Sequence, residues 1–113
     1  MRLRSDIFVS ALTRRVFSMG GFAAVERRGA DQAGAIFIRI RHRDGTEDLY
    51  GPAPQMLVGE EGGRSFERRL RSVEPQAVEA LMARELRFDS DLWLIELDVD
   101  GIGDLIEIAA EEG

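Results

Sequence analysis

The strictest constraint on the fold comes from the segment 35–43, whose side chains alternate in character. One set is apolar (Ile36, Ile38, Ile40) and the other holds one aromatic and two basic side chains (Phe37, Arg39, Arg41). A period of two residues predicts a β-strand with its isoleucine face buried. Asp44-Gly45 follows at once and is typical of a tight hairpin turn. We therefore expect a second strand, over 46–50, to pair antiparallel with the first.

Two other segments repeat their apolar residues at the helical period. Segment 5–19 carries one stripe, and we expect Ser5 to cap the helix and Gly20-Gly21 to end it. Segment 75–87 begins with Pro75, which suits a first helical turn. The expected buried residues are Val9, Leu12, Val16 and Met19 in the first helix, and Val78, Leu81, Met82 and Leu86 in the second.

Further strands are expected over 22–28, 65–71 and 92–99, and Asp100-Gly101 indicates a last hairpin strand over 105–108. Segment 55–64 is rich in glycine and glutamate and is expected to be a mobile loop. The order α-β-β-β-(β)-α-β predicts an α+β fold in one domain over 1–113. We expect two layers, with a mostly antiparallel sheet of four to five strands and both helices on one face. The acidic end, 100–113, is then either a last strand or frayed.

Charge is distributed unevenly along the chain. All 15 basic residues are arginine and lie in residues 1–87, which hold 12 acids, whereas residues 88–113 hold nine acids and no base. This polarity favours an acidic end that docks on its own domain or on a basic partner. Because lysine and cysteine are absent, a lysine Schiff base, a phosphate-loop lysine, a disulfide and a thiolate metal site are excluded. With no apolar run long enough for a membrane helix or a signal peptide, a cytoplasmic location is expected.

Several stretches resemble one family of proteins. They are Ser5-Asp6-Ile7-Phe8-Val9-Ser10-Ala11, Gly34-Ala35-Ile36-Phe37-Ile38, Asp48-Leu49-Tyr50-Gly51-Pro52-Ala53-Pro54 and Phe88-Asp89-Ser90-Asp91-Leu92-Trp93-Leu94-Ile95-Glu96. In this order they resemble domain-of-unknown-function family 1491, small proteins of alphaproteobacteria. The resemblance implies a bacterial domain and brings no activity, cofactor or catalytic residue with it.

The strongest candidate binding residues are arginines. Arg39, Arg41 and Arg43 share one face of a strand, and Arg27 is expected to extend the patch on a neighbouring strand. Asp98, Asp100 and Asp104 form the matching candidate for an acidic partner surface. If the last strands lie beside the arginine strand, these acids neutralise it internally.

Other polar residues favour structural roles. His42, the only histidine, has no nucleophile motif to serve and is interpreted as a residue at a strand end. The run 98–104 matches the start of a calcium loop but then departs from it, with Ile102 at the fifth position and Ala109 at the twelfth. Asp89 and Asp91 fit a polar turn better than an acid–base pair. No catalytic residue, metal or cofactor is predicted.

Three functions remain open. The leading hypothesis is a non-catalytic binding or regulatory module that acts through protein–protein contacts, with a homodimer expected because a small sheet leaves open edges. The alternative is a binder, or a small enzyme, of an anionic metabolite held by Arg39 or Arg41. The third is weak binding of nucleic acid, which the net charge of −6 disfavours.

Overall fold

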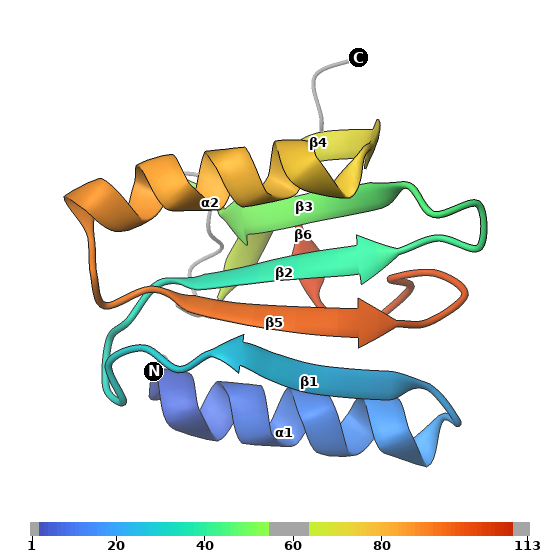
Figure 1. The fold of residues 1–113 in the computed structure, drawn as a ribbon. Helices are drawn as coiled ribbons and strands as arrows, with labels where there is room; N and C mark the ends of the chain where they lie inside the picture. Colours follow the sequence, from blue (N-terminus) through green and yellow to red (C-terminus); the bar gives the residue numbers. More distant parts are fainter. Residues whose placement is uncertain (1–2, 55–63, 110–113) are drawn as a thin grey trace.

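The structure is a computed structural model that describes residues 3–54 and 64–109. Within these residues the chain forms two helices and six strands (Figure 1). Their order is α1 (Ser5–Ser18), β1 (Phe22–Arg27), β2 (Ile36–Arg41), β3 (Glu47–Pro52), β4 (Ser65–Val73), α2 (Pro75–Phe88), β5 (Trp93–Asp98) and β6 (Glu107–Ile108). The α+β class is confirmed. Most of the predicted loop 55–64, and the end of the acidic segment at 110–113, lie outside the described residues.

The strands form one mixed sheet in the order β1-β5-β2-β3-β4-β6. Among the described residues, β2 pairs with β5, and β4 with β6, in parallel, and the other neighbours are antiparallel. The sheet is therefore wider than the predicted four to five strands. The parallel pair of β2 and β5 lies inside the sheet, next to the edge strand β1.

The last strand does not form the predicted hairpin with β5. Instead β6 crosses to the other side of the sheet and pairs with β4. The reason is apolar burial: Leu105 and Ile106 are each 7% exposed and, with Ile102, pack into the core, so this segment covers one face of the sheet before β6 begins. Asp100-Gly101 is thus the start of a crossing connection and not a two-residue turn.

The two helices lie on opposite faces of the sheet, which corrects the prediction of two layers (Figure 1). On one face, hereafter the α1 face, Val9, Leu12 and Val16 pack on the isoleucines of β2 and on Trp93, Ile95 and Leu97 of β5. On the opposite α2 face, Val78 and Met82 pack on Phe37, Leu49 and Leu94. The central strands are apolar on both faces, so each face needs a cover to keep it from water.

The ends of α1 differ from the prediction in two details. Arg4, not Ser5, precedes the helix, and the Ser5 hydroxyl instead donates a 2.6 Å hydrogen bond to the carbonyl of Gly34. The backbone amide of Ser5 donates to the carbonyl of Gln32, which ties the start of α1 to the loop before β2. Met19 continues the apolar period but is 59% exposed, because the chain turns away at Gly20-Gly21.

The predicted hairpin between β2 and β3 is confirmed. The amide of His42 donates to the carbonyl of Thr46, which leaves a loop of three residues instead of two. Gly45 has a φ of 88°, the left-handed conformation that glycine adopts without strain. The side chain of Asp44 accepts hydrogen bonds from both the amide and the hydroxyl of Thr46 and stiffens the turn.

No helix in the described ranges is long and apolar enough to cross a membrane.

Candidate functional site

The predicted arginine face is a buried charge network and not an open surface. Arg39, in the middle of β2, is 5% exposed and lies on the α2 face. Its Nε donates a 2.8 Å hydrogen bond to Oε1 of Glu47, whose side chain is fully buried. Its Nη1 lies 3.3 Å from Glu26 of β1, and its Nη2 lies 3.9 Å from Glu79 of α2. Arg39 therefore links the edge strand β1 and the neighbouring strand β3 to the helix α2.

The two other arginines of this row are more exposed. Arg41 is 53% exposed and lies between Glu47, at 3.4 Å, and Glu96 of β5, at 3.2 Å. Arg43 is almost fully exposed, and its nearest carboxylate is that of Asp100, 3.6 Å away. Of the predicted acids, Asp100 lies beside this row, whereas Glu96, which also meets it, was not among the residues predicted to do so. Glu26, Glu47 and Glu79 come from other elements.

Charge in this network is dominated by carboxylates. Arg39 and Arg41 lie among four glutamates, 26, 47, 79 and 96. Burial raises the pKa of Glu26; the charge of Arg39 opposes that rise, and the nearby carboxylates of Glu96 and Glu47 add to it. Burial would lower the pKa of Arg39, but the hydrogen bond to Glu47 and the surrounding carboxylates raise it overall. The arrangement stabilises cationic arginine within the fold and presents an excess of negative charge to any ligand.

Arg27 does not extend this row. It lies at the end of β1, and β5 separates β1 from β2. Its Nη2 donates a 2.9 Å hydrogen bond to the backbone carbonyl of Ser90, in the turn after α2. In that turn the amide of Asp91 donates to the side chain of Asp89, as expected for a polar turn.

His42 takes part in a second polar cluster, on the α1 face. Its Nε2 lies 3.0 Å from Oδ1 of Asp48, a carboxylate that also accepts a 2.7 Å hydrogen bond from the amide of Ser72 and lies 3.4 Å from Arg68. Burial would raise the pKa of Asp48, but the hydrogen bonds from His42 and Ser72 and the charges of His42 and Arg68 lower it overall. Ser72 has a φ of 49°, a strained backbone conformation for a residue other than glycine. The hydrogen bond to Asp48 therefore holds Ser72 in this conformation near the end of β4. This cluster accords with a structural role for His42.

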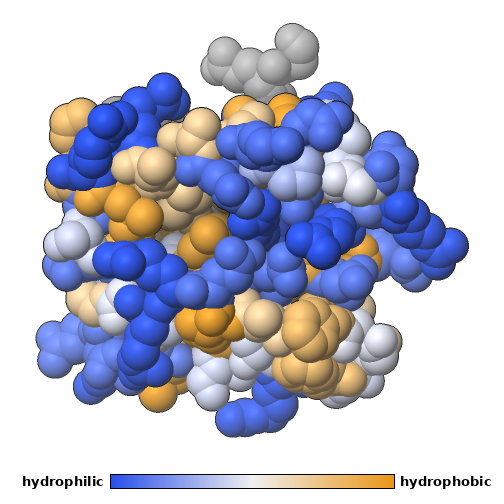
Figure 2. All heavy atoms as spheres, in the orientation of Figure 1, coloured by the Kyte–Doolittle hydropathy of each residue, from blue (hydrophilic) through white to orange (hydrophobic). Residues whose placement is uncertain are grey.

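Exposed apolar side chains gather where α1 ends and β1 begins. Phe17 (53% exposed), Met19 (59%), Phe22 (50%) and Val25 (45%) form this edge patch. The rings of Phe17 and Phe22 meet edge to face with their centroids 5.9 Å apart. Figure 2 shows a hydrophobic area at the lower right, where Figure 1 places this region, with hydrophilic atoms above it. Since β1 is the first strand in the sheet order, its outer edge is left without a strand neighbour among the described residues.

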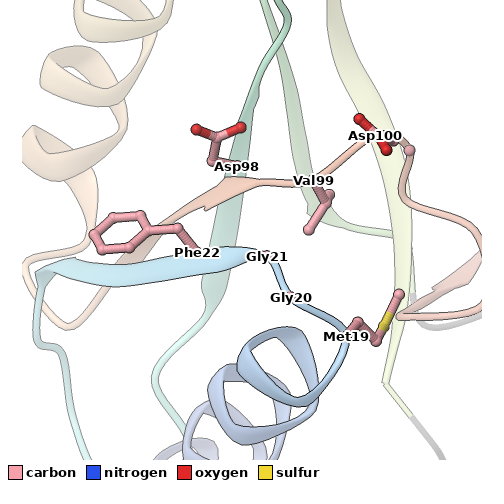
Figure 3. Close-up of a pocket in the computed structure, with 8 residues that line it drawn as sticks. Met19, Gly20, Gly21, Phe22, Asp98, Val99 and Asp100 are labelled. Carbon is pink, nitrogen blue, oxygen red and sulfur yellow. The ribbon is translucent and has the colours of Figure 1, made fainter.

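A shallow pocket of about 390 Å³ adjoins the edge patch (Figure 3). Its lining comes from Met19, Gly20, Gly21 and Phe22 on one side and from Asp98, Val99, Asp100 and Gly101 on the other. Val99 points toward the glycines, and the carboxylates of Asp98 and Asp100 point away from them. Two of the three predicted acidic partner residues thus lie at the rim of this hollow, while Asp104 is exposed further along the chain.

Sequence reasoning missed the glutamates around Arg39 and the whole edge patch. The hairpin did hold a signal for Glu47: once Asp44-Gly45 closes the turn, Glu47 comes opposite Arg41 and diagonal to Arg39. The edge patch carried no such signal, because its residues look like ordinary core residues until the order of the strands is known.

The fold and these sites together define a small α+β domain with a mixed six-stranded sheet, an internal network of ion pairs and an apolar sheet edge. Residues 3–107 match the family described as protein of unknown function (DUF1491), and the chain belongs to that family.

Solved structures of similar chains agree with this assignment. The solution structure of protein Atu0922 from A. tumefaciens is 55% identical, with a TM-score of 0.87, and the match covers 99% of this chain and 98% of that one. A crystal structure of a DUF1491 family protein from Caulobacter crescentus is 29% identical, with a TM-score of 0.78 and coverage of 97% and 100%. An NMR structure of a DUF1491 family protein from the same organism is 30% identical, with a TM-score of 0.76 and coverage of 97% and 99%. No curated protein matches the chain.

Proposed function

We propose that the protein is a non-catalytic binding module that acts through protein–protein contacts, and that its contact surface is the edge patch with the outer edge of β1. The observation that carries this proposal is the coincidence of four exposed apolar side chains with a strand edge. Exposed apolar groups on such an edge cost solubility and invite pairing, so proteins usually cover them. A partner that adds a strand to β1 satisfies its backbone groups and shields Phe22 and Val25 together.

The alternative of an anionic ligand receives less support. Arg39 is buried and bound to Glu47, and the carboxylates around Arg39 and Arg41 outnumber the guanidinium groups. A phosphate or carboxylate would meet net repulsion there. Nucleic acid would meet the same carboxylates, so both functions rank below protein binding. A thermal-shift screen with phosphates and carboxylates checks the alternative, and a clear rise in melting temperature would restore it.

The test of protein binding uses two exposed phenylalanines at different positions. Tagged protein is recovered from its own cells after nuclease treatment, and bound proteins are identified by mass spectrometry. Phe22→Glu places a charge in the edge patch, and the control Phe88→Glu places one at the end of α2, where Phe88 is 83% exposed. We expect Phe22→Glu alone to release a stoichiometric partner, whether a second copy or another protein. Equal recovery with both variants, each shown to be folded by circular dichroism, would refute the edge patch as the contact surface.

A further inference from the structure

We propose that the partner at this edge is a second copy of the chain, whose β1 pairs antiparallel with β1 about a twofold axis at Ala24. The two sheets then join into one, and Arg27 of each copy reaches Asp98 of the other. This inference rests on the proposed function, because it names the occupant of the same edge. It follows from the register of β1, from the charge at its two ends and from the pocket beside it.

The register decides which side chains share a face. Phe22 lies opposite Asp98 of β5, Ala24 opposite Glu96, and Arg27 opposite Leu94, which packs on the α2 face. Opposed residues of paired strands point to the same face, so Phe22, Ala24 and Arg27 all lie on the α2 face. The spacing of three residues between Ala24 and Arg27 results from an irregularity between Val25 and Arg27, which places Glu26 as an extra residue in the strand.

A twofold axis through Ala24 brings complementary residues together. Ala24 then lies opposite its own copy, and Ala23 lies opposite Val25 of the second copy, on the α1 face. Beyond the extra residue, Phe22 lies opposite Arg27 of the second copy, on the α2 face. Across three neighbouring strands, the side chains then lie in the order Arg27 of one copy, Phe22 of the other copy and Asp98 of that other copy. Because the contact is isologous, the arrangement occurs twice in one dimer.

Charge favours this arrangement over pairing with an unrelated strand. Asp98 is exposed, and it has no ion pair or hydrogen bond from its side chain within the described part of the chain. Arg27 is also exposed, and among the residues that the structure describes its side chain donates a hydrogen bond to the carbonyl of Ser90. Neighbouring strands are about 4.8 Å apart, so Arg27 and Asp98, which lie two strands apart, are separated by about 9.6 Å at the backbone, and the arginine side chain extends across Phe22 to reach the carboxylate. A guanidinium over that ring gains a cation–π contact as well as the carboxylate.

The pocket supplies the remaining argument. Phe22 and Asp98 both line it, beside the apolar walls of Met19 and Val99. An arginine that crosses the α2 face suits the part of this hollow formed by Phe22 and Asp98, because its aliphatic stem packs on the ring while its guanidinium meets the carboxylate at the rim. The chain carries both halves of this recognition, with the pocket at the start of β1 and the arginine at its end.

The experiment measures the association constant by sedimentation velocity over a range of concentrations. We expect the wild-type protein to dimerise, with an affinity that falls as salt is raised. Arg27→Asp and Asp98→Arg should each raise the Kd about tenfold or more, and the double variant should recover most of the loss. The matched control is Arg84→Asp, which removes an exposed arginine on α2 and should leave the Kd unchanged. If Arg27→Asp does not fold, Asp98→Arg and Phe22→Glu still test the interface.

Two results would overturn the inference. The first is a wild-type protein that stays monomeric up to its solubility limit. The second is a dimer whose Kd responds to the charge reversals no more than to Arg84→Asp. If the chain is monomeric but Phe22→Glu still releases another protein from cells, the proposed function stands and only the identity of the partner is wrong. If neither experiment depends on Phe22, both proposals fail.

Discussion

Replacing Arg39 with methionine tests whether the ion-pair network holds the sheet together or merely fills space. The change keeps an unbranched side chain of similar length but removes the charge. Glu47, which is fully buried, would lose the hydrogen bonds from Nε and Nη2 of Arg39 and keep only Arg41, at 3.4 Å. An uncompensated buried charge costs about 3–5 kcal/mol, so we expect a loss of that size in the free energy of unfolding.

The partner substitution should cost less. Glu47→Gln leaves Arg39 with two other carboxylates, Glu26 and Glu79, and the amide oxygen of glutamine still accepts a hydrogen bond. We expect a loss of about 1–3 kcal/mol. The double variant Arg39→Met/Glu47→Gln removes both charges and should be more stable than Arg39→Met alone. Arg41→Met is the control, because its half-exposed side chain should contribute only ~0–1 kcal/mol.

Urea unfolding of the four variants forms a double-mutant cycle with its control. The reasoning would be refuted if Arg39→Met cost no more than Arg41→Met. It would also be refuted if the double variant lost the sum of the two single losses, because the two side chains would then contribute independently.

Three further predictions concern the free energy of unfolding. In Gly34→Ala the added Cβ would lie 2.4 Å from the carbonyl oxygen of Asp91, so we expect a loss of about 1–3 kcal/mol by urea unfolding, whereas Gly101→Ala, which meets nothing within 4 Å, should be neutral. Ser5→Ala leaves the buried carbonyl of Gly34 without its hydroxyl donor and should cost about 1–3 kcal/mol, whereas the exposed Ser18→Ala should stay within about 0.5 kcal/mol; equal melting temperatures would contradict this. Because the pKa of Asp48 is lowered below 3.8, its contribution is present above that value and is lost as the pH falls through the folded-state pKa. Asp48→Asn should therefore reduce the loss in the free energy of unfolding between about pH 7 and about pH 3. Glu26→Gln should increase that loss, because the pKa of Glu26 is raised and its effect on the pH dependence has the opposite sign. A change in the same direction for both variants would contradict the assignment.

Local periodicity predicted the elements well because it reflects which side chains meet water. The alternation in 35–43 and the turn at Asp44-Gly45 predicted β2, β3 and their antiparallel pairing. The fourth strand was expected although Arg68 falls on its apolar side, and the structure contains it as β4. There Arg68 lies over the ring of Tyr50 and beside Asp48, so its charge is met without leaving the face.

Pairing between distant segments could not be predicted in the same way. Nothing in β2 or β5 alone specifies that Ile36 lies beside Trp93 in a parallel pair. That pairing decides which strand occupies the edge, and hence that Phe22 and Val25 remain exposed while Ile36 and Ile38 are buried. The alternation also assigned Arg39 to a solvated face, because a charged residue is read as outward-facing. Its burial depends on α2 and on Glu26, which are far from each other in the sequence.

The position of β5 between β1 and β2 has a consequence for biosynthesis. During translation the chain emerges from the N-terminus, and residues 93–98 must leave the ribosome before β1 or the outer side of β2 finds a strand. Until then β2, β3 and β4 have their sheet neighbours on one side, but β1 and the outer side of β2 have no strand to pair with, and α1 has only part of the face that it covers. Closing the sheet requires a contact between positions 36 and 93, a large separation that slows folding and prolongs exposure to chaperones and proteases. Truncation just before β5 should therefore remove the native state altogether, while leaving most of the chain's length in place.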